Sequence, residues 1–230
     1  MYGWTGKILK INLSNRSFEF ICPEKEIYLK YIGGKGLAGF YLNQQITEPW
    51  FSEKMPLLFF SGPLVNTKSP TSGRMTVSSK SPLTGTVGDT SVGGNFGTLM
   101  KKAGYDGIII TGKSEDLTGV AINNEQVEFH SARELKEKTT GEINKVLSHK
   151  GSVATTGPAA ENGVLYSAVA VDGHYMAGRG GLGLVMGEKK LKYIAINGTE
   201  KTEVFDQSEL NTAREEIFRL KSDSTVLQGE

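Results

Sequence analysis

Residues 171–187 read VDGHYMAGRGGLGLVMG, and the interpretation of the whole chain starts from this stretch. Five glycines occur within ten residues, and a single arginine, Arg179, lies among them. Glycine loses more backbone entropy on folding than other residues, so this density indicates close backbone approach to a bound group or turns with positive φ. A second stretch, GDTSVGGNFG at 88–97, has the same character. We therefore expect the two stretches to act as a pair.

The composition argues against several classes of protein. The 230 residues carry 26 Lys and Arg against 25 Asp and Glu, which indicates no basic surface for nucleic acid or an anionic membrane. The apolar runs are too short to span a bilayer, and no basic-then-apolar leader is present. The single cysteine, Cys22, allows no internal disulfide or cysteine metal site and is expected to be a reduced, partly buried thiol. These features predict a cytoplasmic protein.

Alternating and helical apolar patterns predict a mixture of short strands and helices. We expect hairpins at 6–20 and 120–129, and strands at 56–60, 74–78, 107–112, 153–156, 164–171 and 193–196. Helices are expected at 23–34, 37–42, 96–103, 135–147, 182–186 and 206–222. The remainder of 64–97 is predicted to be loop. The fold class is therefore α+β.

The order of these motifs repeats along the chain. The hairpin at 11–20 recurs at 122–129, and the Gly-Pro pair at 62–63 recurs at 157–158, a shift of 95. The Gly-x-x-Gly motif at 94–97 recurs at 180–183, and IIITG at 108–112 recurs as IAING at 194–198, both with a shift of 86. The pattern predicts an internally duplicated domain: two similar halves of mixed or antiparallel sheet with helices packed on one side, related by a pseudo-twofold axis. Chance similarity of glycine-rich segments is the alternative.

The domain boundary is placed after residue 205. Residues 1–205 are predicted to form the duplicated domain, and 206–230 to hold the first helix of a following domain. Asp206 and Glu209 have capping-box spacing, and an apolar stripe at helical spacing follows, made of Leu210, Ala213, Ile217 and Leu220.

The glycine-rich motifs favour an anionic ligand. Two Gly-x-Gly-x-x-Gly patterns begin at Gly34 and Gly178, but neither has the buried strand before it and the acidic residue after it that a dinucleotide site requires. Glycine-rich backbone with Arg74 and Arg179 suits phosphate or another anion, although a surface salt bridge is an equally simple role for each arginine. The three histidines share no metal-ligand spacing. The residues alone predict two glycine loops facing an anionic, doubled ligand, with no complete catalytic set.

Eight motifs carry a resemblance to a known family. They are MYGWTGKILKINLS at the start, GGKGLA at 33–38, SGPL at 61–64, SGR at 72–74, KSPLTG at 80–85, GGNFG with KKAGYDGIIITGK within 93–113, TGPAAEN at 156–162 and DGHYMAGRGGLGLVMGEKKLK at 172–192. Over residues 1–199 the chain resembles the N-terminal domain of the tungsten-dependent aldehyde ferredoxin oxidoreductases. The last motif is long enough to be specific on its own.

The resemblance implies an oxidoreductase that converts an aldehyde and water to a carboxylic acid and passes two electrons through an iron–sulfur cluster to ferredoxin. It implies a metal, tungsten or molybdenum, held by the dithiolenes of two pterin (molybdopterin) cofactors. In this family the cluster cysteines and the substrate-side acid and histidine belong to later domains. The 230 residues are therefore expected to be a cofactor-binding portion that is inactive alone. Its expected partners are C-terminal catalytic domains or a subunit carrying the cluster cysteines, and ferredoxin, with a homo-oligomer left open.

The resemblance also implies roles for individual residues. The backbone carbonyls of Ser91 and Met176 match ligands of a magnesium ion that bridges the two pterin phosphates. Arg74 matches an arginine that links a pterin to the cluster. Pterin-lining positions match Gly93, Ala177, Gly178 and Arg179.

Two residues depart from the family pattern: Tyr175 stands where Arg is common, and Ser91 where Asn is common. A tyrosine cannot make a charge-assisted phosphate contact, whereas a carbonyl contact survives the change at Ser91. The alternatives are an inactive scaffold or assembly module without pterin, or a phosphate- or nucleotide-binding domain.

Overall fold

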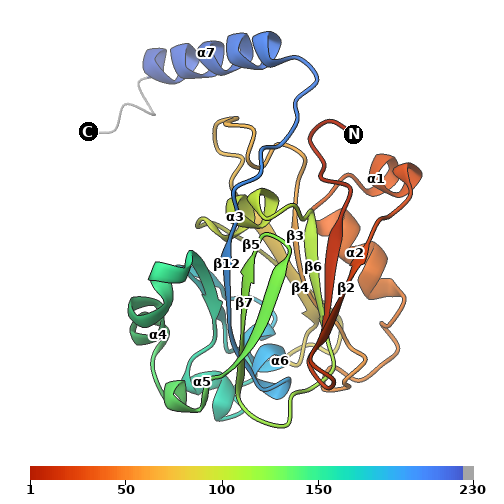
Figure 1. The fold of residues 1–230 in the computed structure, drawn as a ribbon, viewed down its shortest axis with the longest axis vertical. Coiled ribbons are helices and arrows are strands. Elements are labelled where there is room, and N and C mark those ends of the chain that lie inside the picture. Colours follow the sequence, from red (N-terminus) through yellow and green to blue (C-terminus); the bar gives the residue numbers. More distant parts are fainter. Residues whose placement is uncertain (225–230) are drawn as a thin grey trace.

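Two six-stranded β-sheets form the framework of the computed structural model, which describes residues 1–224 (Figure 1). The first sheet has the strand order β2-β1-β6-β3-β4-β5. It is built, with its helices, from β1 (Ile8–Asn12), β2 (Ser17–Ile21), α1 (Lys25–Tyr31), α2 (Lys35–Asn43), β3 (Leu57–Ser61), β4 (Met75–Lys80), β5 (Val87–Val92), α3 (Phe96–Lys102) and β6 (Gly107–Thr111).

The second sheet has the order β8-β7-β12-β9-β10-β11. Its half of the chain contains β7 (Thr118–Asn123), β8 (Gln126–Ser131), η1 (Arg133–Leu135), α4 (Thr140–Leu147), η2 (Ser148–Lys150), β9 (Ser152–Thr155), α5 (Pro158–Glu161), β10 (Val169–Val171), β11 (Tyr175–Ala177), α6 (Leu182–Glu188) and β12 (Leu191–Asn197). The helix α7 (Gln207–Asp223) follows.

The two sheets have the same topology and the same register. In each, the first strand of the hairpin pairs in parallel with the last strand of the half, and the other pairings are antiparallel. Equivalent residue pairs follow the sequence repeat: Ile11 lies opposite Ile110 as Ile122 lies opposite Ile196, and Thr76 opposite Ser91 as Ala170 opposite Met176. This correspondence confirms the predicted duplication into two similar halves.

A shared apolar core lies between the sheets. Side chains of alternate strand residues, such as Leu9, Ile11, Val120 and Ile122, are fully or almost fully buried there. The helices α3 and α6 contact strands of both sheets, so they lie between them. Burial of each large aliphatic side chain contributes about 1.5–3 kcal/mol, which makes this core the main source of stability.

The outer faces of the sheets are covered by separate helices. α1 and α2 pack on the first sheet through Tyr28, Leu37 and Leu42, and α4 packs on the second through Ile143 and Leu147. Figure 1 shows α1 and α2 on one side of the molecule and α4 on the other. Helices thus flank the domain, while α3 and α6 fill its centre.

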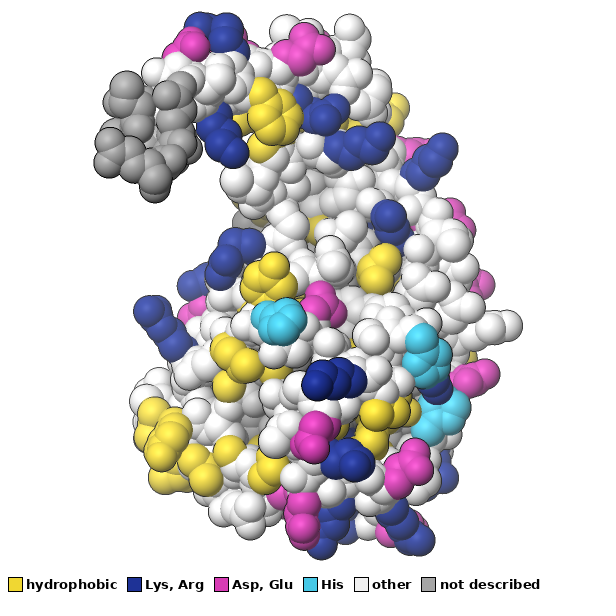
Figure 2. Space-filling view, turned by 90° about the vertical axis from the view of Figure 1, so that its left-hand side faces the viewer, with side chains coloured by type: hydrophobic (Ala, Val, Ile, Leu, Met, Phe, Trp, Pro, Cys, Tyr) yellow, Lys and Arg dark blue, Asp and Glu magenta, His cyan; other side chains and the backbone are white. Residues whose placement is uncertain are grey.

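The surface carries charges of both signs. Figure 2 shows basic and acidic side chains interspersed over the lower part of one face. Cys22 is exposed, so the expectation of a partly buried thiol is wrong: it lies beyond the end of β2. Within residues 1–224, no helix combines the length and apolarity that a bilayer crossing requires.

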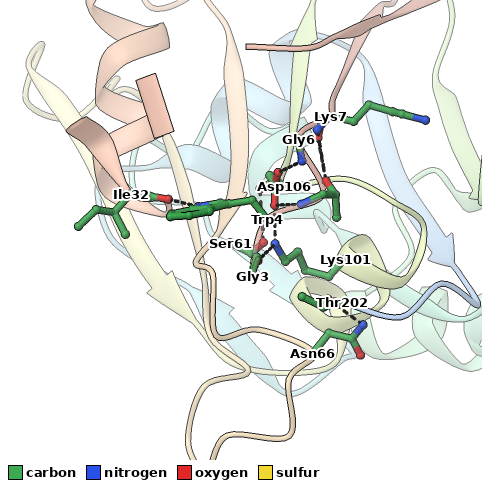
Figure 3. Close-up of polar contacts among 11 residues, drawn as sticks. Gly3, Trp4, Gly6, Lys7, Ile32, Ser61, Asn66, Lys101, Asp106 and Thr202 are labelled. Carbon is green, nitrogen blue, oxygen red and sulfur yellow. Dashed lines mark hydrogen bonds and ion pairs between the residues drawn. The ribbon is translucent and has the colours of Figure 1, made fainter. Parts of the chain in front are cut away.

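The first residues of the chain are tied to the core by a buried ion pair (Figure 3). Lys101 Nζ lies against Asp106 Oδ1, and both side chains are almost completely excluded from solvent. The Asp106 carboxylate also accepts hydrogen bonds from the backbone N–H groups of Thr5 (3.1 Å) and Gly6 (2.8 Å). Lys101 donates to the carbonyl oxygen of Gly3 at 2.7 Å. One pair of charges therefore holds the segment before β1 in place.

Helix α7 stands apart from the sheets (Figure 1). Asp206 accepts a hydrogen bond from the Glu209 N–H at 2.9 Å, as the cap spacing predicts. None of the helix residues is buried, and Ile217, Phe218 and Leu220 are exposed. Of the predicted segment 206–230, residues 225–230 lie outside the described residues.

Most predicted elements are present, and the differences concern short or glycine-rich segments. Residues 64–97 were expected to contain one strand, but β5 pairs with β4 along its whole length, with Gly88, Thr90 and Val92 facing inward. The strand expected at 164–171 begins only at Val169, because the Ser167 carbonyl accepts a hydrogen bond from the Gly183 N–H instead of from a strand.

Three other differences are local. The helix expected at 135–147 begins at Thr140, because Thr139 and Glu142 form a capping box that starts it there. The strand β11 was not predicted, since a strand of three residues gives no periodic signal. The one-turn helix α5 was likewise not predicted.

Lys189 gives the stability of the fold a specific pH dependence. Its side chain is buried, donates to the carbonyls of Glu53 (3.3 Å) and Gly112 (3.2 Å), and burial lowers its pKa from 10.5 to about 8. Between these pKa values the unfolded chain binds more protons at this residue, so its effect on stability becomes more favourable as the pH rises. Between pH 7.5 and 10 we therefore expect the unfolding free energy of the wild type to rise by about 2 kcal/mol relative to that of Lys189→Met.

Urea unfolding of both proteins across that pH range tests this expectation. Taking the difference removes the contribution of tyrosines that titrate in the same range. If the unfolding free energies of the two proteins changed with pH in parallel, the pKa of Lys189 would not be lowered in the folded protein.

Candidate functional site

The two glycine-rich stretches lie side by side at the boundary between the halves. A methyl group at Gly180 would be 3.2 Å from the Cα atom of Gly88, so the backbones approach closely there. The Thr90 hydroxyl donates to the Arg179 carbonyl at 3.2 Å and lies 3.3 Å from the Arg179 N–H, which can donate to it. The pairing expected between the two stretches is therefore present, although which group they serve is a separate question.

These contacts obey the pseudo-twofold relation. Ser91 and Met176 are 85 positions apart, and the Gly-x-x-Gly motifs that follow them are 86 apart. Thr90 therefore corresponds to Tyr175 and Arg179 to Gly93, so the Thr90–Arg179 contact maps onto a contact between Tyr175 and Gly93. A methyl group at Gly93 would lie 3.0 Å from the Tyr175 ring, so these two residues are in contact. The symmetry axis thus passes between β5 and β11.

Ser91 and Met176 occupy equivalent places on the terminal strands of the two sheets. Ser91 lies opposite Thr76, and Met176 lies opposite Ala170. A terminal strand has backbone groups without ladder partners along its free edge. The Ser91 carbonyl is used in this way, since it accepts a hydrogen bond from the Arg74 side chain.

A pocket of about 520 Å³ opens between these strands. It brings together five of the predicted site residues from two distant segments of the sequence: Arg74, Ser91, Met176, Gly178 and Arg179. The complete lining is Lys35, Arg74, Asp89, Thr90, Ser91, Met176, Gly178 and Arg179. Three positive side chains against one negative favour an anionic ligand.

The two arginines of the pocket are held differently. Arg74 donates to the Ser91 side-chain oxygen from Nε at 2.9 Å and to the Ser91 carbonyl from Nη2 at 2.8 Å. Arg179 is exposed, and its guanidinium makes no ion pair with any residue of the described chain 1–224. The salt-bridge alternative therefore does not account for either arginine here.

The residues of the segment 175–178 differ in how open they are. Tyr175 is half exposed, and its ring packs on the backbone of Gly93, where a methyl group would lie 3.0 Å from it. Met176 is half exposed, Ala177 is fully buried, and a methyl group at Gly178 would meet nothing closer than 3.9 Å. Gly178 is therefore an open position, whereas Gly93 is in close contact with the neighbouring ring.

Three lining residues were missed by the sequence analysis: Lys35, Asp89 and Thr90. Lys35 Nζ lies 2.5 Å from Asp89 Oδ2 and comes from the start of α2, more than fifty positions before β5. The GGKG motif around Lys35 was noticed, but nothing in the sequence places it against the second glycine stretch.

Metal-ligating side chains do not gather in residues 1–224, where no group of three or more His, Cys, Asp or Glu residues is placed to hold an ion. A metal at this site would therefore depend on backbone carbonyls or on a ligand that brings its own donor atoms. The pocket can bind an anion through cations, hydroxyls and glycine backbone, but it contains no general acid–base pair. Its chemistry is that of binding and positioning.

Comparison with known proteins gives a consistent picture. A family model described as "Aldehyde ferredoxin oxidoreductase, N-terminal domain" matches residues 8–198. Tungsten-containing aldehyde ferredoxin oxidoreductases of Pyrococcus horikoshii and Pyrococcus abyssi are each 38% identical over 238 residues, covering 100% of this chain and 39% of the relative. A more distant similarity, 29% identical over 95% of this chain and 38% of the relative, is to an aliphatic sulfonate oxidoreductase, WOR-like subunit, of Pyrococcus furiosus.

A solved structure resembles the whole fold. The active-site complex BamBC of benzoyl coenzyme A reductase, in complex with 1,5-dienoyl-CoA, aligns with a TM-score of 0.92 and 32% sequence identity. The alignment covers 96% of this chain and 35% of that chain. This chain thus spans about two fifths of the length of the curated relatives and about a third of that solved chain.

Proposed function

The chain belongs to the aldehyde ferredoxin oxidoreductase N-terminal domain family, and from this membership we propose that it is the cofactor-binding portion of a tungsten- or molybdenum-dependent oxidoreductase. The observation that carries the proposal is the pocket between β5 and β11, which joins Arg74 and Ser91 of one half to Met176 and Arg179 of the other. When bound, the metal–bis-pterin group would supply oxidation of an aldehyde to a carboxylic acid, with electrons leaving through an iron–sulfur cluster to ferredoxin.

The donor set of the pocket fits the phosphate-bearing part of such a group. Two pterins carry two phosphates, and the halves present two equivalent terminal strands. The carbonyls of Ser91 and Met176 are proposed as ligands of a magnesium ion between the phosphates, a cation that prefers oxygen donors. The Ser91 carbonyl accepts from Arg74, and its second lone pair leaves room for a metal contact. The metal itself is proposed to be held by the dithiolenes of the cofactor.

The other predicted residues are proposed to shape the pterin surface. Gly178 leaves open space beside the strand, so a planar group can approach the backbone there. Arg179 has no ion-pair partner in the described chain and is proposed to contact a phosphate. Tyr175, Gly93 and Ala177 are proposed to form the wall against which the pterins lie. Tyr175 supplies ring surface and a hydroxyl there but no charge.

Residues beyond the duplicated domain are proposed to join it to the rest of the enzyme. The relatives are more than twice as long as this chain, and the apolar residues Ile217, Phe218 and Leu220 of α7 are exposed. We propose that α7 packs against a further domain or subunit, which carries the cluster cysteines. On this proposal residues 1–205 bind the cofactor and do not turn over substrate alone.

Metal and pterin analysis tests the function directly. The protein is produced in a tungsten-supplied host together with the polypeptide that carries the cluster cysteines, and its tungsten, molybdenum and pterin contents are measured. Two pterins per metal are expected. A complete protein without pterin would favour a scaffold or assembly module, and thermal stabilisation by nucleotides would favour a nucleotide-binding domain.

Arg74→Ala provides a test at one residue. The side chain is at the pocket surface, so its loss is expected to change the unfolding free energy by no more than about 0.5 kcal/mol. Transfer of electrons from substrate to ferredoxin in the complete enzyme is expected to fall by about tenfold or more, which corresponds to about 1.4 kcal/mol in the barrier. Arg133→Ala, which removes an exposed arginine far from the pocket lining, is the control. Unchanged turnover in Arg74→Ala would remove the role assigned to this residue.

A further inference from the structure

Lys35 lies at an electrostatically unfavourable place unless an anion is near. It is the first residue of the nine-residue helix α2, where the helix dipole disfavours positive charge. Its side chain is 66% exposed and reaches across to β5, where Nζ lies 2.5 Å from Asp89 Oδ2. Asp89 therefore supplies part of the compensation for this lysine.

The balance of charge in the pocket remains positive after that pairing. Lys35, Arg74 and Arg179 line it, and Asp89 is the one acidic residue in the lining. Arg74 is committed to Ser91 through Nε and Nη2, and Arg179 has no acidic partner in the part of the chain that the structure describes. Two positive charges in excess match the charge of a phosphate monoester near neutral pH.

Lys35 differs from the arginines in its freedom to move. A lysine ammonium is a compact charge on a flexible four-carbon stem, so it can leave one oxygen partner for another within the same pocket. Arg74 is fixed by two hydrogen bonds to one residue. Lys35 is therefore the cation of the pocket that can exchange between a protein carboxylate and a ligand.

We propose that Lys35 binds a phosphate monoester group in this pocket and that Asp89 holds the lysine when the phosphate is absent. The proposal rests on the proposed function in one respect: the phosphate belongs to the pterin group expected there. Asp89 then acts as a competitor, because each bound phosphate displaces it from the ammonium. Removal of the carboxylate charge strengthens phosphate binding, and removal of the lysine weakens it.

Titration of the 230-residue chain with inorganic phosphate, followed by calorimetry and by ³¹P resonance, tests the proposal. Lys35→Gln is expected to weaken phosphate binding about fivefold, the effect of one exposed charge pair. Lys35→Arg is expected to stay within about twofold of wild type, and Asp89→Asn to bind more tightly than wild type. Added sodium chloride should reduce these differences, because exposed charges are screened.

Lys10→Gln is the matched control. Lys10 forms a surface ion pair with Glu19 on the hairpin of the same sheet, outside the pocket, so its loss should leave phosphate affinity unchanged. The proposal is overturned if the unaltered chain binds no phosphate, if Lys35→Gln binds as wild type does, or if Asp89→Asn binds more weakly.

Pterin content is measured separately in the complete protein, so the two failures can be told apart. Lys35-dependent phosphate binding without pterin contradicts the proposed function and leaves this inference standing. Normal pterin content, with phosphate binding that is the same in Lys35→Gln as in wild type, supports the proposed function and contradicts this inference.

Discussion

Asp106→Ala is expected to lower the unfolding free energy by about 3–5 kcal/mol, the largest effect of any single substitution argued for this chain. The reason is that the variant leaves Lys101 buried without its counter-ion. Burial already lowers the pKa of the Lys101 ammonium, and Asp106 opposes that effect. The same carboxylate accepts the N–H groups of Thr5 and Gly6, so the segment that precedes β1 is released as well (Figure 3).

Urea unfolding followed by circular dichroism measures the loss. Combining Lys101→Met with Asp106→Asn is expected to recover part of it, because no unpaired charge then remains buried. Asp116→Asn, at an exposed pair with Arg133, is the control and should leave the midpoint unchanged. A small effect of Asp106→Ala, with the double variant no more stable than the single one, would mean that water reaches Lys101.

The fold was predictable to the extent that its repeat is visible in glycines and apolar strands. Motifs such as IIITG and IAING lie in β6 and β12, the strands that pair in parallel with the two hairpins. The two motifs are 86 positions apart in the sequence. The structure confirms that they are equivalent, because Ile110 pairs with Ile11 in the first sheet as Ile196 pairs with Ile122 in the second. The strand β5 escaped prediction because two of its three inward positions, Gly88 and Thr90, are not apolar side chains and so give no apolar alternation.

The site was predictable as a convergence of two glycine stretches, but not in its full composition. Duplication alone implies that equivalent segments meet at an axis, and Arg74 and Arg179 stood out as charges beside glycines. Lys35 could not be assigned, because its approach to Asp89 depends on how α2 packs against the outer face of the first sheet. Sequence spacing contains no information on a contact between residues so far apart.

The contact of Asp172 between the halves was also hidden in the sequence. An aspartate before glycine is common turn chemistry, and Asp172 does have a positive φ of 51°. Its carboxylate, however, accepts the N–H of Asn95 from the first half at 2.7 Å and the N–H of Val153 from the second at 3.1 Å. The Ser152 hydroxyl donates to the same group. One side chain therefore fastens the entry of α3 to the start of β9, directly beside the glycine stretches.

Asp172→Ala is expected to destabilise the protein by about 3 kcal/mol, because the partly buried Val153 N–H and the exposed Asn95 N–H lose their acceptor and alanine is strained at a positive φ. Asp172→Gly removes the same hydrogen bonds without that strain and should be less harmful. Asp172→Asn keeps the shape but has one acceptor oxygen where the carboxylate uses two, so it should cost about 1–3 kcal/mol. Ser152→Ala, which removes only the hydroxyl, is the mildest of the series.

Hydrogen exchange measured by mass spectrometry locates the effect. Amides at 88–97 and 172–181 should exchange faster in Asp172→Asn, whereas those of β1, β6 and β7 should keep their protection, because these strands pair with neither β9 nor β10. If the proposed function holds, the complete protein with the same variant should contain less pterin, since the spacing of Ser91 and Met176 is no longer fixed. Uniformly faster exchange across both sheets would contradict a local role, for it would mean that Asp172 supports the whole fold and not the junction between its halves.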